Sequence, residues 1–352
     1  MPRARTGHPA VVISCPKRMQ YGPCGGVRPS GACELDEALP CPWTSGSPVL
    51  AWDGPEPDAP AVVDPPLVLS DLSVPARDPA TLRAVATRLA EGSDALLVAD
   101  LHDRADFPPT MLAAQLLELG TRPWVTLTCR DRNRVVLEQE VIGLAALGVG
   151  GVLCVTGDSR PGSGAGTTVG AGATQVFDLD ATRLAHLVAS AGLVATATVA
   201  PAAPPTAGRA AALAAKQAAG ARLVVSNHVA SPAVLADFLT AGRAAGVTVP
   251  VVAGVAVFTD ARTARALADL PGLDLDPEAV ATVVDADDPV EAGIEVAVAE
   301  ARALLALDGV VGVNLSGVGS SEGWVPAADL KAEVGRRVRA AHRAESEALR
   351  PG

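Results

Sequence analysis

The chain of 352 residues is long enough for one large domain of about 250 residues with a small one beside it, or for two ordinary domains. Hydrophobic residues make up 49% of it but aromatic residues only 3%, so any core is built from many small aliphatic side chains. The formal net charge of −11 excludes nucleic acid as a bulk partner, because phosphate binding requires a concentrated basic face.

The sequence carries no signal for secretion or for membrane insertion. A secretory signal would join a charged start to roughly seven or more apolar residues, and a membrane helix would need about 18 apolar residues in a row. Neither pattern occurs in the chain. We therefore expect a soluble, cytoplasmic protein with no membrane partner.

Residues 1–50 differ from the rest of the chain because they hold four of its six cysteines, Cys15, Cys24, Cys33 and Cys41. The prolines and glycines between them favour tight turns. A segment so poor in core residues needs a cross-link. Without a secretory signal, coordination of a metal by thiolates is favoured over disulfides.

The identity of that metal stays open, because the spacing lacks the paired C-x-x-C of ordinary zinc ribbons. Zinc held by all four cysteines is the first hypothesis, and an iron–sulfur cluster on the same thiolates is the second. Free or disulfide-bonded cysteines are the third. The other two cysteines, Cys129 and Cys154, are expected to be small buried side chains.

A stretch dense in Pro, Gly and Asp at residues 51–65 predicts a linker, because such residues propagate neither a helix nor a central strand. Short runs rich in Val or Leu then alternate with alanine-rich helical stretches; the runs lie at 67–72, 95–99, 124–128, 152–156, 193–199, 223–226, 251–257 and 310–315. Such runs are typical of parallel strands buried on both faces.

This alternation predicts an α/β fold, a (β/α)8 TIM barrel over residues 66–320, with a doubly wound open sheet as the alternative. The helix expected after residue 134 has an apolar stripe of Leu137, Val141 and Leu144. Three helical segments, at 261–268, 277–284 and 289–307, separate the last two strands. Residues 321–352 predict a charged helical tail.

Polar residues gather at the ends of the predicted strands, where the ligand sites of parallel barrels lie. They are Asp71, Asp100, His102, Thr126, Thr128, the cluster 130–134, Asp158, Thr198, Ser226, Asn227, His228, Thr259, Asp260, Asn314 and Ser316. Asp158 is the strongest candidate, because a glycine-rich loop at 161–173 follows it. That loop matches neither a P-loop nor a Rossmann fingerprint. His102 and His228 fit local hydrogen bonding better than catalysis.

Several motifs, in this order and spacing, resemble those of bacterial 5,10-methylenetetrahydrofolate reductases. They are LTCRDRNR at 127–134, AALG at 145–148, VTGD at 155–158 and FDLD at 177–180, followed by Lys216 with Gly220-Ala221 and by EAGIE at 291–295. The N-terminal elements CPK at 15–17, GPCGG at 22–26 and GACE at 31–34 resemble the cysteine-rich module that accompanies these reductases.

The resemblance implies a barrel that usually binds FAD at its mouth and takes a hydride from NADH or NADPH. It would reduce 5,10-methylenetetrahydrofolate to 5-methyltetrahydrofolate in one-carbon metabolism and methionine biosynthesis. By the same resemblance Asp158 contacts the pterin and tunes the flavin, and Gly157 lies beside the cofactor. Asp178 and Asp180 match a segment that helps hold the ribose and adenine, and Thr128 belongs to the cofactor side of the mouth.

Three positions depart from the family pattern. Asp71 stands where the family's general acid is usually Glu, Thr126 replaces a histidine that contacts the flavin, and Asn227 replaces a glutamine that reads the pterin edge. These departures keep a second hypothesis open: a diverged folate- or flavin-binding barrel, without reductase activity, that serves a one-carbon complex. The cysteine-rich module would then dock a partner protein or a second copy, or serve as an electron-transfer element. A folate methyltransferase is the third hypothesis.

Overall fold

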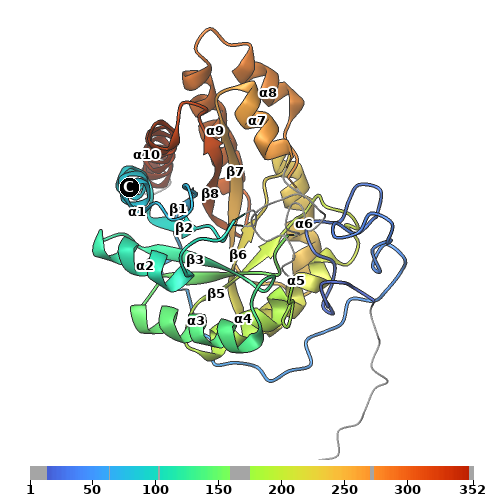
Figure 1. The fold of residues 1–352 in the computed structure, drawn as a ribbon. Coiled ribbons are helices and arrows are strands. Elements are labelled where there is room, and N and C mark those ends of the chain that lie inside the picture. Colours follow the sequence, from blue (N-terminus) through green and yellow to red (C-terminus); the bar gives the residue numbers. More distant parts are fainter. Residues whose placement is uncertain (1–13, 63, 102–103, 159–174, 270–272, 349–352) are drawn as a thin grey trace, which may run out of the picture.

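The computed structural model (Figure 1) describes residues 14–62, 64–101, 104–158, 175–269 and 273–348. Two features singled out in the sequence, His102 and the glycine-rich loop at 161–173, lie outside these residues.

The eight predicted strands form one closed parallel barrel in sequence order. They are β1 Val68–Leu72, β2 Ala95–Val98, β3 Pro123–Thr128, β4 Gly151–Val155, β5 Ala195–Val199, β6 Ala221–Ser226, β7 Val251–Phe258 and β8 Val310–Gly319. Closure is direct, because Leu69 of β1 pairs in parallel with Asn314 of β8. The TIM barrel is therefore confirmed, and the open-sheet alternative is excluded.

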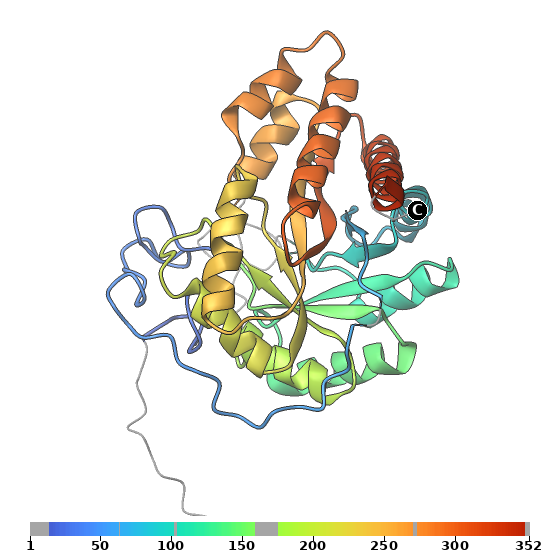
Figure 2. The same cartoon turned by 180° about the vertical axis from the view of Figure 1, so that it is seen from behind.

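Ten helices in the described part of the chain surround the barrel (Figures 1 and 2). They are α1 Pro79–Ala90, α2 Pro109–Glu118, α3 Arg134–Leu147, α4 Ala181–Ser190, α5 Arg209–Ala218, α6 Pro232–Ala244, α7 Ala261–Ala268, α8 Pro277–Val284, α9 Pro289–Leu305 and α10 Trp324–Ala348. No helix in the described ranges is long and apolar enough to cross a membrane.

Helix α3 shows how local sequence sets these boundaries. The Asn133 side chain accepts a hydrogen bond from the Val136 amide at 3.0 Å, which caps the free N–H groups of the first turn. The stripe of Leu137, Val141 and Leu144 is buried, as predicted. Gly148 then ends the helix with φ of 72°, a left-handed conformation that glycine adopts without strain.

The C-terminal helix α10 is part of the barrel wall, because it packs against α1 and α9 (Figure 1). Its buried face includes Val334 and Val338, and it also carries the buried Lys331. The segment expected as a charged tail thus brings one lysine close to β1.

The cysteine-rich segment, residues 14–50, consists of turns and one isolated antiparallel bridge between Ala32 and Pro40. Its loops lie beside α5 and α6 in both views (Figures 1 and 2). The linker then runs along the outside of the barrel, where Trp52 lies with its ring centroid 5.1 Å from that of His186 in α4. Val62 packs against the apolar cluster inside the barrel just before β1 begins.

Candidate functional site

The mouth of the barrel holds a cavity of about 490 Å³. Most of the polar residues predicted from the strand ends line it: Asp71, Asp100, Thr126, Thr128, Arg130, Asp158, Thr198, Ser226, Asn227, His228, Asn314 and Ser316. Among the described residues, 131–134, Thr259 and Asp260 do not line it. Asp260 caps α7 in a reciprocal capping box with Thr263, and the Thr259 hydroxyl donates to the Gly319 carbonyl at 3.1 Å. The strand ends thus converge on one site.

A second cavity of about 280 Å³ adjoins the first and shares Gly157, Asp158, Thr198 and Asn227 with it. One of its walls comes from the cysteine-rich segment, through residues that include Lys17 and Cys24. Asp158 therefore stands between two spaces, one inside the mouth and one against the N-terminal segment.

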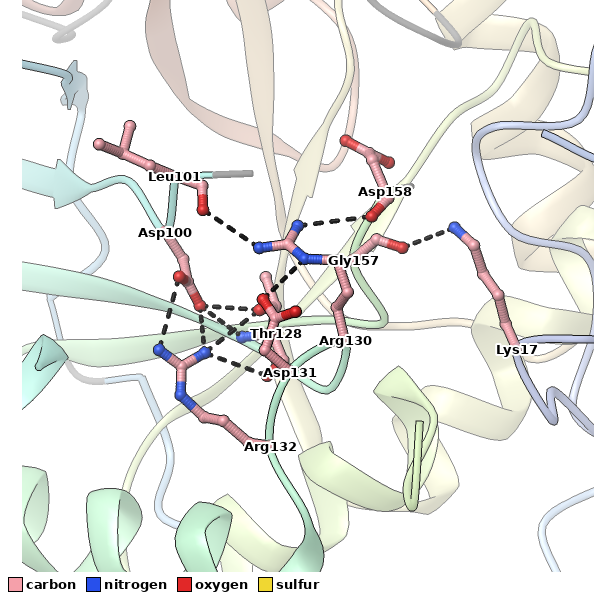
Figure 3. Close-up of polar contacts among 9 residues, drawn as sticks. All are labelled: Lys17, Asp100, Leu101, Thr128, Arg130, Asp131, Arg132, Gly157 and Asp158. Carbon is pink, nitrogen blue, oxygen red and sulfur yellow. Dashed lines mark hydrogen bonds and ion pairs between the residues drawn. The ribbon is translucent and has the colours of Figure 1, made fainter. Parts of the chain in front are cut away.

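The β3 side of the site is a closed network of polar contacts (Figure 3). Asp100 accepts hydrogen bonds from the Thr128 amide at 3.1 Å and from the Thr128 hydroxyl at 2.8 Å, and it forms an ion pair with Arg132. Thr128 is only 3% exposed, because this network encloses it. Thr128 therefore fixes the shape of the mouth in this structure, and its predicted contact with a cofactor stays a prediction.

Arg130 fixes the turn that presents Asp158 (Figure 3). Its guanidinium is buried and donates to the Leu101 carbonyl at 3.1 Å, to the Asp158 carbonyl at 3.4 Å and to the Asp131 carboxylate at 2.8 Å. Gly157 has φ of +99°, and a Cβ there would lie 2.8 Å from the Cβ of Arg130. Only glycine fits this position.

Asp158 itself is exposed, and its carboxylate points away from Arg130 (Figure 3). It lines both cavities, so the structure places the strongest candidate of the sequence where a ligand can reach it. Thr126 and Asn227 border the larger cavity as well, Thr126 from within β3 and Asn227 directly after β6. The residues predicted to meet the substrate thus share one space.

Asp71 lies at the β1 side of the larger cavity. Asn314 donates from Nδ2 to its carboxylate at 2.9 Å, and Lys331 donates to its backbone carbonyl at 3.1 Å. Burial raises the pKa of Asp71, although Lys331 and the Asn314 hydrogen bond act in the opposite direction. The Oδ1 atom of Asn314 is buried and meets no hydrogen-bond donor among the described residues.

Both ring nitrogens of His228 contact other groups of the protein. Its Nδ1 lies 2.7 Å from the Asp274 carbonyl and its Nε2 lies 2.7 Å from a carboxylate oxygen of Glu300. Burial, the largest single cause, would lower the pKa of this imidazole, but the contacts with Glu300 and Asp274 together outweigh it and the net shift is upward. The local hydrogen bonding expected from the sequence is what the structure shows.

Asp178 and Asp180, predicted to hold the ribose and adenine, are occupied by protein groups. Asp180 is 1% exposed, caps α4 and accepts from the Gln20 amide at 3.2 Å. Asp178 accepts from the Arg134 amide at 3.2 Å and pairs with Arg18 at 3.4 Å. Neither residue lines either cavity. Their contact with a cofactor stays a prediction that this arrangement does not favour.

Two positively charged residues that line the smaller cavity, Lys216 and Arg209, were not predicted from the sequence as site residues. Lys216 donates to the Thr198 carbonyl at 2.6 Å, and burial lowers its pKa to about 8. Arg209 donates to the Cys24 carbonyl at 3.1 Å, and burial lowers its pKa to about 10. The family motif contained Lys216, but helical periodicity gives no sign that either side chain reaches the barrel mouth.

All four N-terminal cysteines are free thiols, and Cys15, Cys24 and Cys41 border one small apolar cluster. Burial raises the pKa of Cys24 to about 12, and its Sγ lies 3.2 Å from Glu34. Over the described ranges, no group of three or more His, Cys, Asp or Glu residues is placed to hold a metal ion. Coordination of a metal by these cysteines stays a prediction.

Comparison with known proteins points to one family. The family model described as "Methylenetetrahydrofolate reductase" matches residues 105–322, and the one described as "Methylene-tetrahydrofolate reductase C terminal" matches residues 4–51. No curated protein matches the chain.

Among solved structures, an uncharacterized protein from Clostridium thermocellum shares the fold, with a TM-score of 0.53 at 14% identity over 76% of this chain and 93% of the other. Its title states that it binds two copies of 5-methyl-5,6,7,8-tetrahydrofolic acid. The reductase model covers more than half of the chain and spans β3 to β8, whereas β1 and β2, with Asp71 and Asp100 at their ends, lie before the matched residues. The chain therefore belongs to the methylenetetrahydrofolate reductase family.

Proposed function

We propose that this protein reduces 5,10-methylenetetrahydrofolate to 5-methyltetrahydrofolate with NADH or NADPH as the source of the hydride. The observation that supports this function best is the meeting of Asp71, Asp158 and Asn227 around one cavity. Family membership supplies the class of substrate. A cavity of about 490 Å³ is within the usual range of roughly 300 to 1,000 Å³ for small-molecule sites.

The two carboxyl groups take different roles in this proposal. The substrate carries its methylene carbon between two nitrogens, so reduction must break one C–N bond and supply one proton to the nitrogen that leaves. Burial raises the pKa of Asp71, so Asp71 holds its proton at a higher pH than an exposed carboxyl and suits a general acid. Its proton goes to the leaving nitrogen, the hydride goes to the methylene carbon, and water restores the acid.

Asp158 is the group that orients the pterin. Its carboxylate is exposed in the mouth, and the turn that carries it is held by Arg130. A carboxylate accepts hydrogen bonds from the N–H groups of a nitrogen heterocycle. Asn227 offers a further acceptor around the same space. The substrate would thus be held by acceptors on two sides.

FAD, which the family implies, finds only part of its expected site here. Thr126, Gly157 and Asp158 border the cavities and could hold a flat ring. Asp178 and Asp180, expected to hold the ribose and adenine, bond to protein groups instead. When bound, a flavin would carry the hydride between the nicotinamide and the folate. We keep FAD as a proposal and assign no step to it.

The second candidate, a folate-binding barrel without reductase activity, is supported by two observations. The side chains of Asp71 and Asn227 are each one methylene shorter than the Glu and Gln of the family pattern. The Clostridium thermocellum protein of similar fold is described as binding a methylated folate, and no reaction is attributed to it there. A displacement of about 1 Å in a reacting group can cost roughly 100-fold in rate.

The test is to purify the full chain, record its visible spectrum, and follow methylenetetrahydrofolate-dependent oxidation of NADH and of NADPH with and without added FAD. The reductase proposal expects turnover in at least one of these conditions. Binding of 5-methyltetrahydrofolate without turnover in any of them would support the second candidate instead.

A further inference from the structure

Lys17 of the cysteine-rich segment reaches the turn that carries Asp158 (Figure 3). Its Nζ donates to the Gly157 carbonyl at 2.5 Å, although 140 positions separate the two residues in the chain. The Gly157 carbonyl belongs to the peptide that joins Gly157 to Asp158. A hydrogen bond to it restricts rotation of that peptide and so fixes where the Asp158 side chain begins.

Lys17 is buried, Glu34 is its ion-pair partner, and the charge of Asp158 also stabilises its ammonium. Its side chain is 2% exposed, and it forms an ion pair with Glu34, whose side chain is 1% exposed. The ammonium also lies 5.8 Å from the centre of the Phe177 ring. Glu34 accepts from Cys24 as well, so the pair belongs to the interior of the segment. A buried ion pair seldom contributes net stability, and this makes a role at the neighbouring site worth testing.

The segment that carries Lys17 is tied to the barrel at further points. Arg209 of α5 donates to the Cys24 carbonyl at 3.1 Å, and the Gln20 amide donates to Asp180 at the start of α4. Gly22 has φ of +124°, and a Cβ there would lie 2.5 Å from the Cβ of Ala212 in α5. The segment is therefore seated closely against the elements that border the smaller cavity.

We propose that the cysteine-rich segment is a wall of the active site and that Lys17 is a positioning residue, which holds the Gly157–Asp158 peptide so that Asp158 meets the pterin. This inference rests on the proposed function, because it takes folate as the ligand of Asp158. It assigns to the segment a direct part in folate recognition, besides any part in metal binding.

The test is a double-mutant cycle on the full chain with Lys17→Met, Asp158→Asn and both together. Two quantities are measured for each protein: kcat/KM for reduction and the Kd of 5-methyltetrahydrofolate. If Lys17 acts through Asp158, each single change weakens binding about 10-fold or more, and the double variant is scarcely worse than Asp158→Asn alone. Losses that multiply in the double variant would overturn the proposal.

Loss of one partner leaves a buried charge unpaired, so a second variant guards against misfolding. Lys17→Met with Glu34→Met replaces the whole pair by apolar side chains and should restore the melting temperature. We expect this variant, with its stability restored, to bind the folate about 10-fold more weakly than the wild-type protein does. Binding that returns together with stability would show a merely structural pair and contradict the proposal. Glu37→Gln is the matched control, because Glu37 is exposed in the same segment.

The binding measurement also separates this inference from the proposed function. A wild-type protein that binds 5-methyltetrahydrofolate but never reduces its precursor would remove the reductase, while the cycle on Kd still decides the role of Lys17. A wild-type protein that neither binds the methylated folate nor turns over would overturn both.

Discussion

The two acids at the barrel mouth differ in almost every respect except their chemistry. Asp158 follows β4, is exposed, and sits on a turn held from below by Arg130 and from the side by Lys17. Asp71 lies within β1, is largely enclosed, and receives a hydrogen bond from Asn314. The difference teaches that one site can keep a carboxylate for binding and a carboxyl for proton transfer by environment alone.

The largest expected effect is that of Asp71→Asn, which removes the proposed acid and keeps the shape. Turnover should fall by about 10²- to 10⁴-fold, the usual contribution of general acid catalysis. The Kd of 5-methyltetrahydrofolate should change little. The melting temperature at neutral pH should not fall, since an amide neither buries a charge nor has to take up a proton on folding, as a carboxyl of raised pKa must. Wild-type turnover in this variant would remove Asp71 from the mechanism.

Asp158→Asn should produce the opposite pattern, a smaller loss of rate together with weaker binding. We expect the Kd of 5-methyltetrahydrofolate to rise by about 10-fold or more, because the amide cannot accept as a charged group does. Isothermal titration of both variants side by side makes the comparison direct. If both variants lose binding equally, the division of roles is wrong.

Gly157→Ala tests the turn below Asp158, with Gly148→Ala as its control. Both glycines have positive φ, but a Cβ at Gly157 meets the Cβ of Arg130 at 2.8 Å, whereas nothing lies within 4 Å at Gly148. Strain alone costs about 1 to 3 kcal/mol at such a position. Thermal unfolding should show the larger loss for Gly157→Ala, and only that variant should lose activity. Equal losses of thermal stability in the two variants would mean that the Arg130 side chain moves aside at little cost.

The smallest effect concerns His228 and Glu300, which lie outside the proposed chemistry. The pKa of His228 is raised above its ordinary value of about 6.5, so its contribution to stability is full below that pH. The contribution is lost as the pH rises through the raised value. His228→Gln should therefore flatten the fall of melting temperature that accompanies a rise of pH above about 6.5. An identical pH dependence in both proteins would contradict the pairing.

The barrel could be predicted from the sequence because its strands are buried on both faces, which leaves continuous runs such as that of β7. Asp71, Asp158 and Asn227 were found because parallel strands end at one edge of a barrel. The roles of Lys17 and Arg209 could not be found this way. Their contacts join segments that are far apart in the chain, and the hydrophobic periodicity of helices and strands does not predict such contacts.

Asp178 and Asp180 show the reverse case, in which residues of a family motif bond to the protein itself, while their expected contact with a cofactor stays a prediction. Their carboxylates bond to backbone amides of the protein. An acidic residue just before a helix serves as an N-cap as readily as a ligand group. Sequence alone does not distinguish the two uses.

The most direct test of the whole account is the formation of 5-methyltetrahydrofolate from 5,10-methylenetetrahydrofolate and NADH or NADPH by the wild-type chain. The account predicts one molecule of product for each nicotinamide oxidised, and a loss of at least about 100-fold in Asp71→Asn. The absence of product from wild-type protein that binds the folate, with FAD present or absent, would contradict it.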